Sequence, residues 1–339
     1  MMSQFKMMSR FKAALHWIRR HPIRTSACAG FVGIVALNGL AYQQARAMMW
    51  FANPGARTQR PERLSGLEKI QVLFTGIRVP RPENTASPAD FDLPFETLRI
   101  PVDRTVTVEA WSIPAESTRG TVVLFHGYAA AKEELLPEAR RFHGWGYTVW
   151  LVDFRGSGGS SERYTTIGYL EAEDVAAAVQ MIRSQSRSVP VILYGRSMGA
   201  AAVLRAIRAH DVSADAVILE SVFDKLTTTA GNRFQLMGLP AFPGANLLVF
   251  WGGVAAGFPA SRHNPVDDAP ACHAPTLMLH GELDLNARID EGQRVLHQLG
   301  DRHARLIPFP NTGHSPTLQA DSEKWQQAIQ EFFSERLGH

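Results

Sequence analysis

The sequence contains few cysteines and none of the spacings that usually bind metal ions. Its two cysteines, Cys28 and Cys272, are separated by most of the 339 residues, so a disulfide framework within the body of the protein is excluded. Neither Cys-x-x-Cys nor His-Glu-x-x-His occurs, and the 12 histidines are scattered. We therefore expect no metal site and no organic cofactor.

The chain also lacks a basic surface on its main body. Its formal net charge of +3 comes from the first 24 residues, which contain no acid. The six basic residues there are Lys6, Arg10, Lys12, Arg19, Arg20 and Arg24. The remainder carries 29 basic and 32 acidic residues. Nucleic acid is therefore not an expected partner, because binding it needs a basic face on the folded domain.

An uncharged segment of 21 residues, 25–45, follows this basic arm. At about 1.5 Å per residue, a helix of this length crosses a hydrocarbon core of about 30 Å. We expect a transmembrane anchor; a signal peptide cleaved near Ala45-Arg46-Ala47, or a soluble helix, are the alternatives. The charge bias predicts that residues 1–24 are cytoplasmic and that the body lies on the periplasmic side of a bacterial inner membrane.

Regular patterning begins after a connector rich in proline and arginine, residues 46–94, which we expect to be extended. We predict strands at 95–100, 106–113, 121–125, 148–152, 191–194, 216–219, 276–279 and 305–307. We predict helices at 133–143, 170–184, 198–210, 287–299 and 322–336. Apolar runs that alternate with helices indicate a mostly parallel α/β sheet covered on both faces. Functional side chains are then expected just after the strands.

The pentapeptide Gly195-Arg196-Ser197-Met198-Gly199 stands between one such strand and a helix rich in small residues. Strand, G-x-S-x-G, helix is the arrangement that exposes a nucleophilic serine on a tight turn, because the flanking positions must lack bulk. A serine that only caps the following helix is the structural alternative.

Two further polar residues follow later strands in the order required of a catalytic triad. Asp284 comes after the run 276–279, and His314 follows 305–307. His314 could take the proton of Ser197 as general base, and Asp284 could orient the imidazole. Glu282 and Glu220 are competing acids; we expect Glu282 to face solvent and Glu220 to hold the adjoining loop.

With this ordered set, residues 95–336 resemble the α/β-hydrolase superfamily, in the esterase- and lipase-like serine-hydrolase branch that carries an N-terminal membrane segment and a short lid. The resemblance implies an oxyanion hole formed by the backbone N–H groups of Met198 and Tyr128. It also implies that His126 supports the Tyr128 loop, and that Asp153 and Arg155 belong to a structural turn. The glycines that follow Arg155 lack the remainder of a nucleotide-binding pattern.

An uncharged stretch of 28 residues, 234–261, lies inside an insert at about 223–272. The resemblance implies that this insert is the lid over the nucleophile. Its apolar side chains could simply bury one another. Alternatively, five of them could line an acyl pocket or present an apolar surface to the bilayer: Phe242, Leu247, Leu248, Phe250 and Trp251.

The sequence therefore predicts a membrane-anchored serine hydrolase that cleaves carboxylic esters through an acyl-enzyme intermediate, with a small-molecule or lipid ester as substrate. Thioesters and amides or peptides are alternative substrates, because the same triad serves all of them. A non-catalytic binding protein of this fold is a further alternative. The oligomeric state is not predicted.

Overall fold

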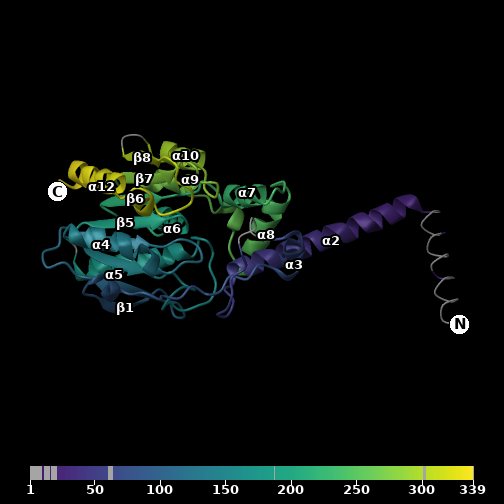
Figure 1. The fold of residues 1–339 in the computed structure, drawn as a ribbon, viewed down its shortest axis with the longest axis horizontal. Helices are drawn as coiled ribbons and strands as arrows, with labels where there is room; N and C mark the ends of the chain where they lie inside the picture. The colour runs from purple at the N-terminus through teal and green to yellow at the C-terminus, as the bar shows by residue number, and fades with distance from the viewer. Residues whose placement is uncertain are drawn as a thin grey trace.

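The computed structural model describes Arg10, His16 and residues 21–59, 64–186, 188–300 and 303–338. Its centre is an eight-stranded sheet with the order β1-β2-β4-β3-β5-β6-β7-β8 (Figure 1). β1 pairs antiparallel with β2, and β2 antiparallel with β4. All other neighbouring strands are parallel. The predicted mostly parallel sheet is confirmed.

The strands lie close to the predicted positions. They are β1 Glu96–Pro101, β2 Thr107–Ile113, β3 Thr121–Phe125, β4 Thr148–Val152, β5 Val191–Arg196, β6 Ala216–Glu220, β7 Thr276–Gly281 and β8 Ala304–Phe309. Four neighbouring strands, β3, β5, β6 and β7, are buried along their whole length. They could be predicted because both faces of a covered parallel sheet need apolar side chains.

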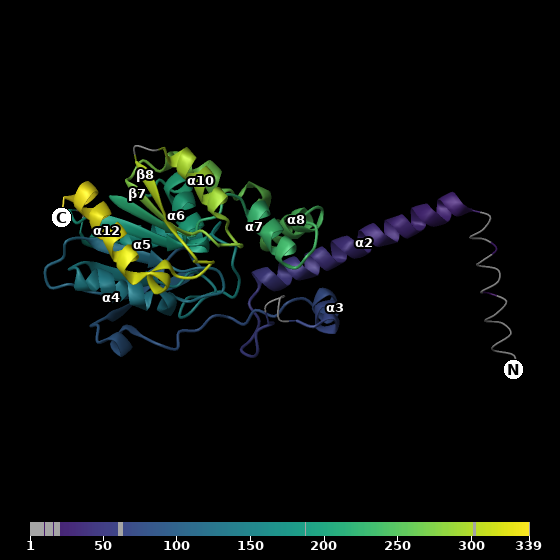
Figure 2. The same ribbon diagram turned by 45° about the horizontal axis from the view of Figure 1, so that its top comes forward.

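Helices cover both faces of this sheet (Figure 2). On one face, Val122 and Leu124 of β3 pack in a core with α4 (Leu136–Gly144) and α12 (Ser322–Leu337). On the other face, Val123 and Phe125 pack in a core with three further helices. These are α5 Glu171–Gln185, α6 Met198–Ala209 and α10 Ile289–Leu299. Successive strand residues alternate between the two cores because side chains point to opposite faces of a strand.

The N-terminal region begins with a long helix, α2 (Pro22–Met49), that projects from the body (Figure 1). Within it, Ser26–Met49 has a mean hydropathy of 1.3 and is long and apolar enough to cross a membrane. Most of the predicted basic arm lies outside the described residues. We expected the connector to be extended throughout. The structure differs, because the helix α3 (Gly66–Thr75) interrupts it. Ser65 and Glu68 form a capping box that starts this helix.

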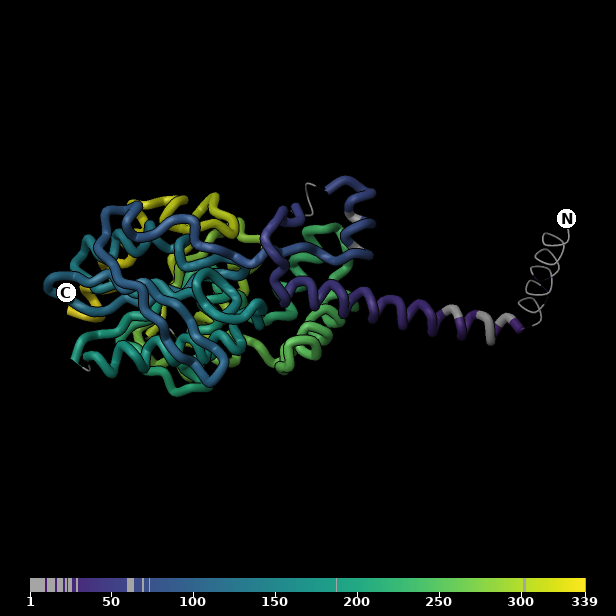
Figure 3. Tube along the Cα trace, turned by 90° about the horizontal axis from the view of Figure 1, so that it is seen from below, coloured from purple at the N-terminus to yellow at the C-terminus, as the bar shows by residue number. Residues whose placement is uncertain are grey.

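The chain between β6 and β7 contributes two helices beside the end of α2, namely α7 (Leu226–Leu236) and α8 (Gly244–Ala256) (Figure 3). The contacts of α2 with the body are made largely to α8. Short elements complete the described chain. They are η2 Pro88–Phe91, η3 Lys132–Leu135, η4 Ala260–Arg262, α9 Pro265–Asp268, η5 Ala269–Ala271 and α11 Thr317–Ala320.

Candidate active site

Ser197 occupies the tight turn between β5 and α6. Its backbone has φ 52° and ψ −110°, a left-handed conformation that a non-glycine residue rarely adopts. A Cβ atom on Gly195 would come within 3.0 Å of Gly199 and Ala200, and one on Gly199 within 3.0 Å of the Phe125 main chain. The two glycines therefore allow the turn to lie against the end of β3, as the sequence motif predicts.

Three side chains from separate loops are hydrogen-bonded in series at the carboxyl edge of the sheet. Nε2 of His314 lies 3.1 Å from the Ser197 hydroxyl, and Nδ1 of His314 lies 2.7 Å from a carboxylate oxygen of Asp284. Because a carboxylate only accepts, Nδ1 carries the proton and Nε2 is free to accept from the serine hydroxyl. The structure thus brings together the three residues that the sequence singled out.

The Asp284 carboxylate is held in place from both sides. It is buried, and its second oxygen accepts hydrogen bonds from the N–H groups of Asn286 at 2.9 Å and Ala287 at 3.0 Å. Gly281, at the end of β7, lies under the loop that carries His314. A side chain on Gly281 would collide with the main chain of Thr312 and Gly313. Asp284 and His314 can therefore approach each other.

The two competing acids do not contact His314. Glu282 is exposed. Glu220 is fully buried and accepts hydrogen bonds from the N–H and hydroxyl of Thr317, at 2.6 and 2.7 Å, and from Arg196 at 2.8 Å. Burial raises the pKa of Glu220, but Arg196 and the Thr317 N–H outweigh it and hold the pKa below its usual value. Glu220 therefore anchors the chain three residues after His314.

The loop after β3 carries Tyr128 to the same turn. The position of a Cβ on Gly127 would be 3.8 Å from the Cβ of Ser197, so this loop lies directly against the nucleophile. His126 is buried; its Nε2 accepts from the Phe154 N–H at 3.1 Å, and its Nδ1 donates to the Gly127 oxygen at 2.8 Å. Burial lowers the pKa of His126, so the ring is neutral and holds the loop.

Met198 begins α6, where the first N–H groups of a helix have no acceptor within the helix. Tyr128, Ser197 and Met198 line one pocket. The arrangement can therefore place a substrate carbonyl between the serine hydroxyl and main-chain donors.

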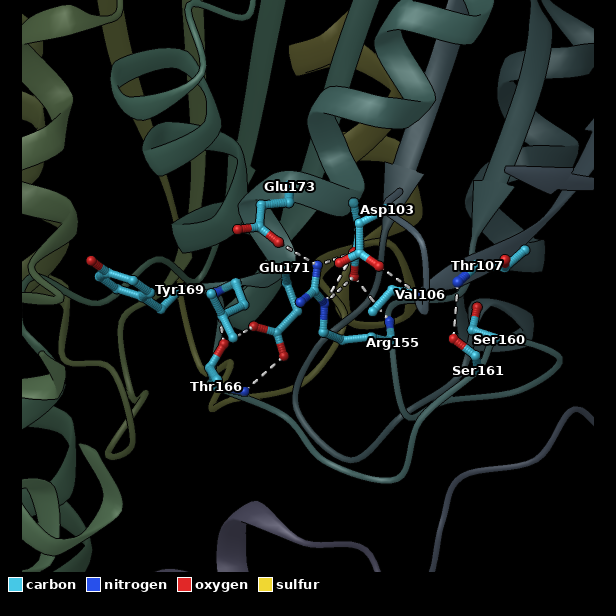
Figure 4. Close-up of polar contacts among 12 residues, drawn as sticks. Asp103, Val106, Thr107, Arg155, Ser160, Ser161, Thr166, Tyr169, Glu171 and Glu173 are labelled. Atoms are coloured by element: carbon cyan, nitrogen blue, oxygen red, sulfur yellow. Dashed lines mark hydrogen bonds and ion pairs between the residues drawn. The ribbon is translucent and has the colours of Figure 1, made fainter. Parts of the chain in front are cut away.

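The glycine-rich segment after β4 is held by polar contacts within the fold. The Arg155 guanidinium binds the buried Asp174 carboxylate at 2.7 Å. It also reaches the Glu173 carboxylate at 2.9 Å, as Figure 4 shows. Nearby, buried Glu171 accepts from Thr166 N–H at 2.9 Å. The contacts of Arg155 and Glu171 are internal to the fold, which agrees with a scaffold role for this segment.

The pocket at Ser197 is mostly apolar, and its empty space of about 690 Å³ includes a part open to solvent. α7 and α8 supply Leu226, Ala230, Leu248 and Val249 to its lining, and α7 also supplies Arg233.

Only Leu248 of the five insert residues proposed for the acyl pocket lies along it. Phe242 and Phe250 are 76% and 56% exposed. Trp251 packs edge-on against Tyr42 of α2, and Leu247 is half-buried. Phe242 and Phe250 therefore do not line the pocket. Their exposed position is the one expected of the alternative, in which the insert presents an apolar surface.

Sequence reasoning missed one wall of this pocket. Ala45, Met48 and Met49 of α2 line it together with Ser197. Ala45 and Met49 are also buried. No local pattern links these residues to a serine 148 or more positions later, because their contact depends on how the insert folds back onto α2.

The comparisons with known proteins agree with this fold. The family described as serine aminopeptidase S33 matches residues 116–239. A monoacylglycerol lipase of Mycolicibacterium smegmatis is 24% identical over 240 residues, which cover 62% of this chain and 85% of the lipase. Protein bem46 of Schizosaccharomyces pombe is 23% identical over 258 residues, covering 75% of this chain and 81% of that protein.

Among solved structures, an esterase of Pyrococcus furiosus superposes with a TM-score of 0.64 and 22% identity, covering 76% of this chain and 97% of the esterase. An esterase of Exiguobacterium antarcticum gives a TM-score of 0.53 and 20% identity, covering 69% of this chain and 98% of that esterase. These likenesses agree with the strand order and the mostly parallel sheet. The chain has the α/β-hydrolase fold, and its relatives and structural neighbours support a likeness to the esterase- and lipase-like branch.

Proposed function

We propose that this protein is a serine hydrolase that cleaves carboxylic esters through an acyl-enzyme intermediate. The observation that carries the proposal is the series of hydrogen bonds from Asp284 through His314 to Ser197, which ends at an apolar pocket. A serine hydroxyl needs a base within hydrogen-bond reach to act as a nucleophile, and His314 is within that reach.

In the first half of the reaction, the Ser197 hydroxyl oxygen attacks the ester carbonyl and its proton passes to Nε2 of His314. The N–H groups of Met198 and Tyr128 stabilise the negative charge that develops on the carbonyl oxygen. Asp284 stabilises the imidazolium. Collapse of the tetrahedral intermediate breaks the bond to the leaving alcohol, which takes the proton from His314.

In the second half, water attacks the acyl-enzyme. His314 takes one proton of the water and returns it to the Ser197 oxygen as the acid leaves. Both halves use the same side chains, and their stoichiometry balances as ester plus water giving acid plus alcohol. The apolar pocket favours an apolar acyl group. Thioesters and amides or peptides are the alternative substrates, since the triad can open all three bonds.

We also propose that α2 is an uncleaved membrane anchor, with residues 1–24 in the cytoplasm, 46–94 as connector, and the hydrolase domain, 95–336, on the periplasmic side. The length and hydropathy of Ser26–Met49 support the anchor. Cleavage near Ala45-Arg46-Ala47 is less compatible with the structure, because Ala45 is buried in an unbroken helix. The insert at about 223–272 would act as the lid.

The proposal is tested by hydrolysis of a series of esters and matched thioesters by the full chain in detergent. Ser197→Ala and His314→Ala should each lower kcat by about 10³-fold or more, and Asp284→Asn should also lower it strongly. The exposed Glu282→Gln is the control and should leave kcat unchanged. A well-folded wild type without activity on any member, and without reaction with a fluorophosphonate, would favour a non-catalytic binding protein.

A further inference from the structure

The helix α2 is joined to α8 of the hydrolase domain and to α3 of the connector by specific contacts along its C-terminal part. The indole N–H of Trp251 on α8 donates to the side-chain oxygen of Asn38 at 3.0 Å. The Gln43 and Gln44 amides donate to main-chain oxygens of α3, at 2.7 and 2.6 Å. Since Ala45 is also buried, α2 is packed into the domain from Asn38 onward.

This packing determines how close the domain is to the bilayer. The stretch from Ser26 to Leu37, before these contacts begin, is 12 residues long, which corresponds to about 18 Å of helix. A hydrocarbon core is about 30 Å thick. If α2 spans it, the part of α2 that contacts α3 and α8 must lie in or at the membrane, and these two helices must lie there as well.

The surfaces of α3 and α8 have the composition that such a position requires. Leu67, Ile70 and Phe74 of α3 are 83%, 56% and 61% exposed and have the spacing of one helical face. On α8, Phe250 and Val254 are 56% and 54% exposed, one turn apart. Figure 2 shows α3 and α8 on either side of the base of α2. We call the exposed apolar side chains of these two helices the α3–α8 surface.

The same part of α2 forms a wall of the pocket. Met48 and Met49 line it together with Ser197, and a Cβ atom built on Gly252 of α8 would lie 4.0 Å from the sulfur of Met49. The pocket therefore lies between the membrane helix and the catalytic turn. An acyl chain attached to Ser197 would run along α2 and α8, the two helices that reach the bilayer.

We propose that α2 is both anchor and acyl-binding wall, and that the site takes lipid acyl chains directly from the bilayer on which the α3–α8 surface rests. This inference rests on the proposed function. We favour lipid over a protein as the occupant of the α3–α8 surface. This surface is continuous with α2, the candidate membrane span, and its apolar side chains lie on both sides of α2. A second copy of the chain would instead make activity depend on protein concentration.

Wild-type protein in phosphatidylcholine vesicles provides the first test. A long-chain alkyl fluorophosphonate with a diazirine at the end of its chain is added; the Ser197 oxygen displaces fluoride from phosphorus, and the serine proton passes to His314. After illumination, peptide mass spectrometry should find cross-links to residues 45–49 and 248–252. Labelling of Ser197 with cross-links only outside α2 would overturn this inference and leave the proposed function intact. Absence of labelling would overturn the proposed function itself.

The second test measures delivery from the bilayer. The variant Leu67→Ser/Ile70→Ser/Phe74→Ser is compared with Gln71→Ser/Thr75→Ser, which changes exposed polar residues of the same helix. The readout is kcat/KM for a long-chain ester embedded in vesicles divided by that for a soluble butyrate ester. This ratio should fall about tenfold in the first variant and not in the second. Equal ratios in the two variants would contradict uptake from the bilayer. A ratio that changes with protein concentration would also contradict it.

Discussion

The phenol of Tyr128 donates a hydrogen bond to the main-chain oxygen of Met48, over 2.7 Å. One residue thus joins the loop beside the nucleophile to the helix α2. Burial raises the pKa of the Tyr128 phenol, so it stays protonated and remains a donor at physiological pH. The ring also lies 6.4 Å from that of Phe51, just after α2.

Tyr128→Phe should therefore weaken the coupling between α2 and the site while leaving the backbone N–H of residue 128 in place. Loss of one partly buried hydrogen bond is worth about 1 kcal/mol, so the melting temperature in detergent should fall by a few degrees and kcat several-fold. Labelling of Ser197 by a fluorophosphonate should persist. An unchanged melting temperature would show that this hydrogen bond does not hold α2 to the domain.

Gly199→Ala should strongly reduce activity, because its Cβ would collide with the main chain of Phe125 and His126. These neighbours are backbone atoms of β3 and its loop and cannot move aside cheaply. We expect kcat/KM to fall at least about 10²-fold, since small displacements of a nucleophile have effects of this size. Gly66→Ala is the matched control, because nothing lies within 4 Å of its Cβ position. Similar activities of the two variants would show that the turn tolerates bulk.

Glu220→Gln tests the positioning role assigned to the buried acid. Its carboxylate binds Thr317, shortly after His314, and Arg196, which also pairs with Glu138. Removing the negative charge should lower the free energy of unfolding by about 2–4 kcal/mol and reduce kcat about tenfold with little effect on KM. Glu282→Gln should do neither. A loss of activity as large as that of His314→Ala would instead place Glu220 in the triad.

His263 should make the protein less stable as the pH falls. Its ring is buried; Nε2 donates to the Ile167 oxygen at 2.9 Å, and Nδ1 has no partner among the described residues. Burial lowers the pKa of His263 from its ordinary 6.5 to about 4. Between these two pH values the unfolded chain binds a proton that the folded chain does not, so stability decreases with acidification, by up to about 3 kcal/mol.

The variant His263→Gln keeps a donor for the Ile167 oxygen and has no titrating group. Its melting temperature should therefore depend less on pH than that of the wild type between pH 7 and pH 4.5. Thermal unfolding of the wild type and of the variant, followed by tryptophan fluorescence at each pH, measures the two melting temperatures. The same pH dependence in the two proteins would mean that His263 is not the group responsible.

The sheet could be predicted because each covered parallel strand must be apolar on both faces. The runs at 121–125 and 148–152 coincide with β3 and β4. The helix α3 was not predicted, because it lies in a connector whose many prolines indicate extended chain. The capping box of Ser65 and Glu68 was nevertheless a local signal for its start. The exposed apolar face of α3 also lacks the core contacts that usually determine a helix.

The approach of Ser197, Asp284 and His314 could be expected from the sequence, because strand ends of one parallel sheet meet at the same edge. The wall formed by Met48 and Met49 could not. It depends on the packing of α8 against α2, and both helices are apolar on several sides, so their sequences do not specify which side faces the other.

The most direct measurement of the central claim is mass spectrometry of the peptide that contains Ser197 after the full chain has reacted with a fluorophosphonate. A single phosphonyl adduct on Ser197 is predicted, absent in Ser197→Ala and formed at least about 10²-fold more slowly in His314→Ala. A folded wild type without an adduct, or with one on another residue, would contradict the assignment of Ser197 as the nucleophile.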